Sequence, residues 1–259
     1  MSVFARIVIG VDGTELGFEA LRQALSLAPA DAPVDAVTAL ETGPAARTGF
    51  DAAYWTAQLE DEAEAARATA SAMLEGRPGA TAGVAGGRPV DVLRRARDEA
   101  GATLLALGGR RSSRLLGVML GDTGTELLHD DACSVLLARP HPDGEWQPRD
   151  VVVGVDGSSW SLAALAAADE LSGRLGSAVE VVSAADGGSP PSGPWAERVD
   201  VWEEGHPVRA LVDRSARVDL VVVGSRGAHG VRALGSVSER VAHQARCSVL
   251  VVHEPAAGR

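Results

Sequence analysis

The chain has 259 residues, of which 46% are hydrophobic and 23% are charged, the composition of an ordinary globular protein. Its formal net charge of −11 argues against nucleic acid as a partner. All 24 basic residues are arginine, which excludes a lysine-containing phosphate loop and lysine-based covalent chemistry.

The N-terminal residues, the apolar runs and the cysteines bear on the expected cellular location. The first ten residues lack the basic segment and long apolar run of a signal peptide. No apolar run approaches the roughly 20 residues that span a bilayer, so we expect a cytoplasmic protein with no membrane contact. Cys133 and Cys247 are too few for a disulfide framework or a zinc site, and we expect both to be thiols buried in strands.

Short apolar runs alternate with helical patterns through the first 140 residues, which predicts a parallel, doubly wound α/β sheet. Runs typical of buried strands lie at 6–11, 34–40, 81–84, 103–107 and 134–138. Helical spacing is found at 14–28, 51–74, 89–100 and 122–130, and residues 108–121 read as a loop.

The pattern begins again after a polar, proline-rich segment at 141–149. Strands are predicted at 151–155, 178–183, 198–202, 220–223 and 247–252, and helices at 159–171, 207–216 and 237–245. The sequence VDGT at 11–14 returns as VDGS at 155–158, and CSVLL at 133–137 returns as CSVLV at 247–251. This duplication predicts a domain at 1–140, a linker at 141–149 and a shorter second domain at 150–259.

The second copy is abbreviated. Asp156 follows Asp12 by 144 residues, whereas Gly224 follows Gly108 by only 116, so about 28 residues are missing between the first and fourth strands. The lost material matches the long helix at 51–74, and the glycines and prolines of 184–195 cannot sustain a helix.

Glycine loops follow the fourth strand of each copy. In the second copy, Gly224 and Gly227 come directly after the strand, and Gly235 precedes the next helix. Backbone N–H groups in such a loop, and the start of the helix behind it, are suited to binding phosphate. A glycine-rich turn without a ligand explains the same spacing equally well.

Together these motifs make the chain resemble the universal stress protein family, in its tandem two-domain form. The resemblance is based on the V-D-G-[ST] strand ends, a loop of the form G-x2-G-x9-G-[ST] and the closing C-S-V-L strand. It implies five-stranded parallel sheets of order 3-2-1-4-5, which pair through their fifth strands as an intramolecular pseudo-dimer. One branch of the family binds ATP between the ends of strands one and four, and the other branch has lost the loop.

The resemblance implies a nucleotide site in the second copy. There the loop glycines and the backbone around Gly235 would cradle phosphates, the Ser236 hydroxyl would donate to one, and Asp156 would line the nucleoside end. Only seven residues separate Gly227 from Gly235, where the family pattern has nine. The full set of implied binding residues is Val155, Asp156, Gly224, Gly227, Gly235, Ser236, Val237 and Ser238.

The first copy contains a degenerate version of the same glycine loop. Gly108 and Gly121 match the pattern, but Arg111 replaces the second glycine and Asp122 replaces the Ser/Thr. A carboxylate would then stand where a phosphate should bind. Asp122 is also a routine first-turn stabiliser of a helix, and we assign Asp12 a structural role in its turn.

Three functions remain open. The chain is either a stress-response regulator that binds ATP, with Mg²⁺, in its second half without dedicated catalysis, or a nucleotide-free scaffold for an unknown protein partner. A slow ATP hydrolase is the third reading, although no nucleophile–base–acid set is evident. The six histidines show no metal-ligand spacing, and further homo-oligomerisation is left open.

Overall fold

In the computed structural model, the described residues are 2–43, 51–112, 117–119, 121–130, 132–141, 146–187, 189–225 and 236–253. Packing divides the chain into two units. The N-terminal unit is Phe4–Gly108, and the C-terminal unit is Gly109–Arg259 together with Met1–Val3. This division differs from the division into repeats, because the fifth strand of the first repeat packs within the C-terminal unit.

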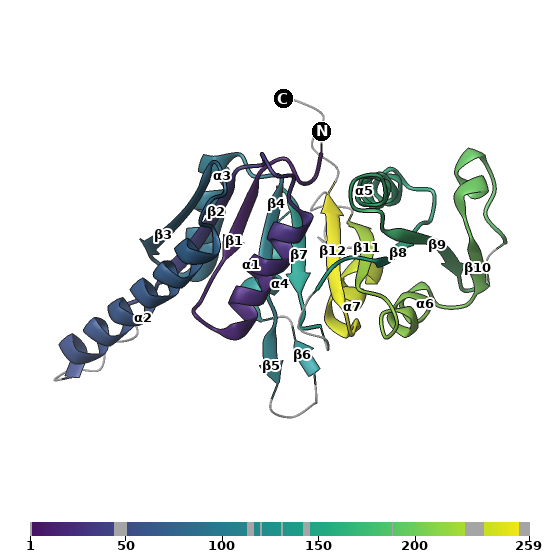
Figure 1. Cartoon of the computed structure of the whole chain (residues 1–259). Coiled ribbons are helices and arrows are strands. Elements are labelled where there is room, and N and C mark those ends of the chain that lie inside the picture. Colours follow the sequence, from purple (N-terminus) through teal and green to yellow (C-terminus); the bar gives the residue numbers. More distant parts are fainter. Residues whose placement is uncertain are drawn as a thin grey trace. The chain divides into compact units, whose positions relative to one another are not determined.

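The N-terminal unit is built around a central strand that is rich in β-branched residues. Strand β1 (Ile7–Gly10) has three fully buried residues and pairs in parallel with β2 (Val34–Leu40) and β4 (Leu104–Gly108). Strand β3 (Ala80–Gly86) extends the sheet beyond β2. The order β4-β1-β2-β3 is that expected for the first four strands of a doubly wound sheet (Figure 1).

Capping residues, proline and glycine mark the ends of helices in this unit. Helix α1 (Glu15–Leu27) is capped by Thr14, whose side chain accepts a hydrogen bond from the Gly17 N–H. Helix α3 (Pro89–Ala100) begins with proline and ends at Gly101, whose φ of 62° is left-handed. Helix α2 (Ala52–Met73) packs on β2 and β3, but buries only Ala63, Ala66 and Ala70.

The C-terminal unit contains the second repeat with the predicted order. Its parallel strands are β8 (Asp150–Gly154), β9 (Ala178–Ala185), β10 (Val201–Glu204), β11 (Leu220–Ser225) and β12 (Ser248–His253), arranged β10-β9-β8-β11-β12. Helices α5 (Ser159–Leu175), α6 (Pro207–Arg214) and α7 (Ser236–Gln244) connect them. As predicted, the described residues between β9 and β10 lack a counterpart of α2, and a short 3₁₀ helix, η3 (Pro194–Arg198), stands there.

The closing strands of the two repeats pair with each other, as predicted. Strand β7 (Ser134–Ala138) runs antiparallel to β12, with Leu136 opposite Leu250. Each end of the pair carries the same hydrogen bond: the Arg139 N–H donates to Ser248 Oγ (3.0 Å) and the His253 N–H donates to Ser134 Oγ (3.1 Å). These matched contacts fix the register of two strands in which every residue is buried.

Three local predictions were wrong. Within the expected loop at 108–121, strands β5 (Arg110–Ser112) and β6 (Gly117–Met119) form an antiparallel hairpin. The strand predicted at 198–202 is β10, shifted toward the C-terminus by η3. Cys133 and Cys247 immediately precede β7 and β12 and do not belong to them.

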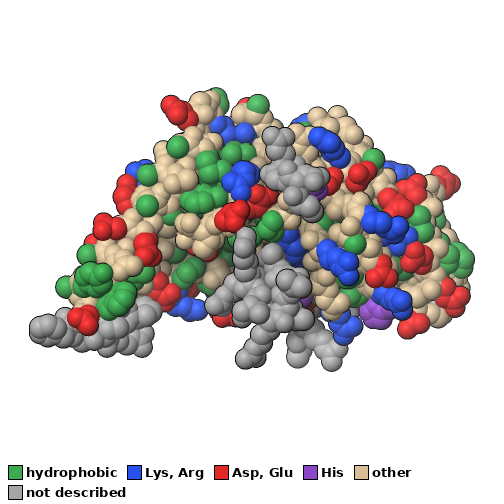
Figure 2. Space-filling view, turned by 60° about the horizontal axis from the view of Figure 1, so that its bottom comes forward, with side chains coloured by type: hydrophobic (Ala, Val, Ile, Leu, Met, Phe, Trp, Pro, Cys, Tyr) green, Lys and Arg blue, Asp and Glu red, His purple; other side chains and the backbone are tan. Residues whose placement is uncertain are grey.

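The distribution of charge on the surface agrees with the composition. Figure 2 shows acidic and basic side chains interspersed on the visible face, without an extended basic patch. None of the helices in the described ranges is both long and apolar enough to cross a membrane.

The paired strands give a stability prediction. Leu136→Ala should lower the free energy of unfolding by about 2–5 kcal/mol, because the side chain is fully buried and its loss leaves a cavity. Leu162→Ala on α5, where the side chain is 38% exposed, is the matched control and should cost much less. Urea denaturation measures both, and equal effects would contradict a packed strand pair.

Candidate functional site

The first candidate element is the turn that joins β8 to α5. The Asp156 carboxylate accepts hydrogen bonds from the Ser158 N–H (3.0 Å) and from Ser158 Oγ (2.6 Å), while Ser158 caps α5. Gly157 between them has φ of 80°, which explains why glycine stands there. Asp12 and Thr14 repeat these contacts in the N-terminal unit, so the turn is a structural device of both repeats.

The end of β11 lies very close to the start of α5. A Cβ atom on Gly224 would come within 2.3 Å of the Trp160 carbonyl oxygen. Gly108 stands in the same relation to the carbonyl of Leu16 in the N-terminal unit. Both glycines are therefore required by the packing of strand against helix, a role that holds with or without a ligand.

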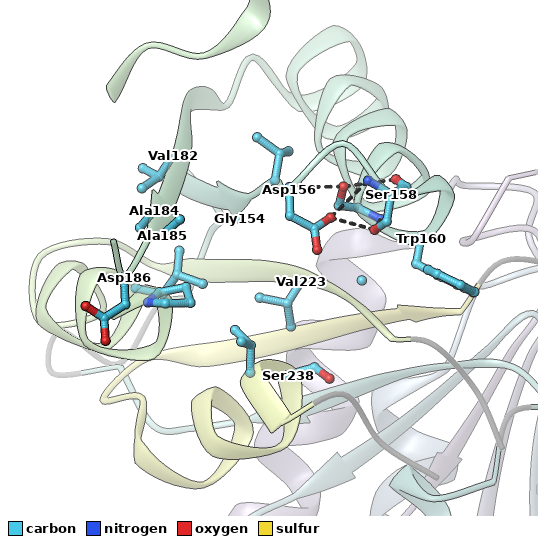
Figure 3. A pocket seen from close by; sticks show the side chains of 16 residues that line it. Gly154, Asp156, Ser158, Trp160, Val182, Ala184, Ala185, Asp186, Val223 and Ser238 are labelled. Atoms are coloured by element: carbon cyan, nitrogen blue, oxygen red, sulfur yellow. Dashed lines mark hydrogen bonds between the residues drawn. The ribbon is translucent and has the colours of Figure 1, made fainter. Parts of the chain in front are cut away.

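A cavity of about 400 Å³ opens at the carboxyl ends of β8, β9 and β11 in the C-terminal unit (Figure 3). This is the point at which the strand order reverses, where open α/β sheets place their ligands. Its volume lies within the range of small-molecule sites. It is lined by Gly154, Val155, Asp156, Ser158, Trp160, Ser161, Val182, Ala184, Ala185, Asp186, Pro207, Leu211, Val223, Gly224, Val237 and Ser238.

The polar groups of the cavity are divided between its two sides. Asp156 and Asp186 follow β8 and β9, and Figure 3 shows them apart from Ser238 on α7. None of the described lining residues is basic. The first turn of α7 faces the cavity with Val237 and Ser238, and a helix start carries partial positive charge. The cavity thus combines a carboxylate side, an apolar wall and a helix N-terminus.

The structure brings together five of the predicted binding residues: Val155, Asp156, Gly224, Val237 and Ser238 all line the cavity. Ser236 is the first residue of α7. Gly227 and Gly235 lie outside the described residues. How these positions act on a ligand stays a prediction.

The lining residues that sequence reasoning did not include among the binding residues are led by Trp160, Asp186 and Leu211. Asp186 could have been found, because it directly follows β9, whose end must lie beside that of β8 in a doubly wound sheet. Trp160 stands two residues after the cap of α5, but its position beside Gly224 depends on helix–strand packing. Leu211 comes from α6 and reaches the cavity only through tertiary contacts.

In the first repeat, the residues of the degenerate glycine loop lie at the start of a helix and in a short strand. Gly121 is the N-cap of α4 (Asp122–Leu128), and the exposed Asp122 lies in its first turn. That placement fits the stabilising role of an acidic residue at a helix start. Arg111 lies in β5.

A tryptophan occupies the place of the missing helix in the second repeat. In the N-terminal unit, a Cβ atom on Gly13 would contact the side chain of Ala66 in α2. In the C-terminal unit, the indole of Trp195 lies so close to Gly157 that a Cβ there would meet its ring at 2.5 Å. The shorter second repeat therefore covers its turn with one aromatic side chain from η3.

The cysteines are thiols and not a disulfide. Cys133 is buried, as expected, but Cys247 is only half-buried as a residue. Burial nevertheless raises the pKa of the Cys247 thiol to about 12, although the positive charge of Arg139 acts in the opposite direction. The thiol therefore stays protonated and unreactive at neutral pH.

The fold and the cavity define a doubly wound α/β protein with a crevice of about 400 Å³ at its switch point. A model of the universal stress protein family matches residues 4–139 and 192–253. The chain belongs to the universal stress protein family.

Individual relatives agree with this assignment. Universal stress protein Rv2623 of Mycobacterium tuberculosis is 36% identical over 188 residues, which cover 59% of this chain and 62% of the relative. A universal stress protein of Mycolicibacterium smegmatis is 35% identical over 181 residues, 58% of this chain and 62% of its own. These matches span less than two thirds of the relatives' length.

Solved structures share the fold. A universal stress protein from Archaeoglobus fulgidus superposes with a TM-score of 0.74 at 20% identity, over 96% of this chain and 98% of its own. A putative universal stress protein from Pseudomonas aeruginosa gives a TM-score of 0.65 at 15% identity, over 96% and 93% of the two chains.

The close approach at Gly224 can be tested directly. Gly224→Ala forces β11 and α5 apart and should lower the free energy of unfolding by about 1–3 kcal/mol, as overpacking does. Gly173→Ala, in α5 with no neighbour within 4 Å of its Cβ position, should be neutral or stabilising by about 0.5–1 kcal/mol. Denaturant titration of both variants gives the comparison, and a neutral Gly224→Ala would contradict the packing role.

The raised thiol pKa predicts slow chemistry at Cys247. A thiol-specific reagent at pH 8 should modify neither cysteine quickly in the native protein and both after denaturation. A single fast-reacting thiol under native conditions would contradict the burial of these groups.

Proposed function

We propose that this universal stress protein is a stress-response regulator that binds ATP in the cavity of its second repeat, without dedicated turnover. The cavity is the observation that carries the proposal: about 400 Å³ at the ends of β8 and β11, closed by the first turn of α7. The family membership supplies the regulatory context.

The β8–β9 side of the cavity suits a nucleoside. Val155, Val182 and Leu211 offer an apolar wall for the flat face of a base. The carboxylate of Asp156 accepts hydrogen bonds, as a ribose hydroxyl or a base amine would provide. Placing the uncharged end of the ligand here also keeps its phosphates away from the two aspartates.

The α7 side suits the phosphates. The first N–H groups of a helix lack partners within the helix, and the helix dipole favours an anion at this end. Gly224, near the end of β11, lines the cavity without a side chain that could obstruct a ligand. The binding of the phosphates thus depends on backbone groups more than on cationic side chains.

Magnesium and turnover follow from the same residues. Mg²⁺ usually binds through substrate phosphates with one or two protein oxygens, and within the described ranges no three His, Cys, Asp or Glu side chains cluster as metal ligands. Asp156 already accepts two hydrogen bonds from Ser158. We therefore assign the bound nucleotide the role of a signal, with hydrolysis near the background rate.

Titration calorimetry with ATP and Mg²⁺ tests the proposal. We expect at most one site per chain, lost in Ser236→Asp, since a carboxylate ~4 Å from a phosphate charge at an effective dielectric of ~20 costs ~4 kcal/mol. That penalty corresponds to roughly a thousandfold in affinity.

Asp122→Ser is the matched control, because it makes the reverse change at the equivalent position of the first repeat. It should leave the site in the second repeat unchanged. Two equal sites, or binding that is indifferent to Ser236→Asp yet altered by Asp122→Ser, would show that the assignment to the second repeat is wrong. Absence of binding in the unmodified protein would favour the scaffold function.

A further inference from the structure

Residues of the first repeat lie near both ends of helix α7, and at its C-terminal end one of them makes hydrogen bonds. At its start, His129 Nε2 lies 3.8 Å from the Glu239 carboxylate. At its end, the Arg139 guanidinium donates hydrogen bonds to the carbonyls of Ala242, in the last turn, and Cys247, 3.2 Å away before β12. The same helix presents Val237 and Ser238 to the cavity. A wall of the second repeat's cavity is thus positioned by the first repeat.

Arg139 is an unusual residue for this place. It is only 4% exposed, and burial lowers the pKa of its guanidinium to about 10, which still leaves it charged at neutral pH. A buried charge is costly unless it finds partners. One of its partners here, the Ala242 carbonyl, lies at the negative end of the α7 dipole, where a cation is favoured.

The duplication shows that the arginine is not imposed by the strand itself. Arg139 stands six residues after Cys133, and the residue six after Cys247 is His253. Both residues use their backbone N–H groups for the matched hydrogen bonds at the ends of the strand pair. The arginine side chain is therefore an addition to this architecture, and it acts on the helix that borders the cavity.

We propose that Arg139 is a positioning residue for the cavity of the second repeat: it fixes α7 from behind and strengthens the positive end of the helix that faces the phosphates. A nine-residue helix moves as a rigid rod, so its last turn sets the place of its first. The cation also offsets the negative end of the helix dipole. This inference rests on the proposed function, since it concerns the affinity for a phosphate-bearing ligand.

The expected signature is a charge-dependent loss of affinity. Arg139→Met keeps most of the side-chain volume but removes the charge and the donors. It should weaken ATP binding by about tenfold or more, ADP less, and adenosine, whose contacts lie on the β8–β9 side, by less than about threefold. Arg139→Lys keeps the charge and should restore most of the ATP affinity. Calorimetry well below the unfolding temperature measures all three ligands.

A second neutral variant and a matched control keep the test decisive. Arg139→Gln can still donate a hydrogen bond, so if Arg139→Met does not fold, the comparison of Gln with Lys isolates the charge. Arg246→Met removes the same charge from an exposed residue just beyond α7 and should change ATP affinity little. An equal loss of ATP and adenosine affinity in the Arg139 variants would indicate general damage and overturn the proposal, as would an unchanged ATP affinity.

The outcome separates this inference from the function on which it rests. Unmodified protein that binds none of the three ligands refutes the proposed function and the inference with it. Unmodified protein that binds ATP, with Arg139 variants that bind it equally well, refutes only the role of Arg139.

Discussion

The antiparallel pairing of β7 with β12 is the interaction on which the organisation of the C-terminal unit depends. These strands are buried along their whole length, and matched serine hydrogen bonds fix their register at both ends. An unpaired edge of this composition would invite association with other chains. By covering it, the pairing places Arg139 of the first repeat against α7 of the second, and so links the two copies.

The two repeats have diverged around one conserved device, the Asp-Gly-[Ser/Thr] turn. Its hydrogen bonds are almost the same in both copies: 2.6 Å between the aspartate and the hydroxyl in each. The surroundings differ: the first copy keeps a long helix over the turn, whereas the second uses Trp195. This cavity lies in the copy that lost the helix, and it is lined in part by Asp186, where the shortened segment begins.

The fold could be predicted from the sequence because its signals are local and repeated. Buried β-branched runs, the returning VDG and CSVL segments, and the glycines and prolines that replaced a helix all act within a few residues. The β5–β6 hairpin was missed because its short strands carry little periodicity. The cysteines were misplaced by one residue because strand ends are set by pairing partners.

The site was only partly predictable, for a different physical reason. Asp156 and Gly224 follow strands directly and could be placed by the topology of the sheet. Leu211 and Arg139 depend on contacts between helices and strands far apart in sequence, which no local pattern reports. The role of Gly224 was also broader than expected, because the carbonyl of Trp160 requires a glycine there even without a ligand.

We propose that one adenine nucleotide binds per chain, in the second repeat. Photolabelling with 8-azido-ATP, followed by peptide mapping, tests it most directly, because the reactive base reports its own location. We expect label on peptides that contain Asp156 or 182–186, and its removal by excess ATP. Label found instead on the N-terminal unit, Phe4–Gly108, and abolished there by excess ATP would show that the nucleotide does not bind where we propose.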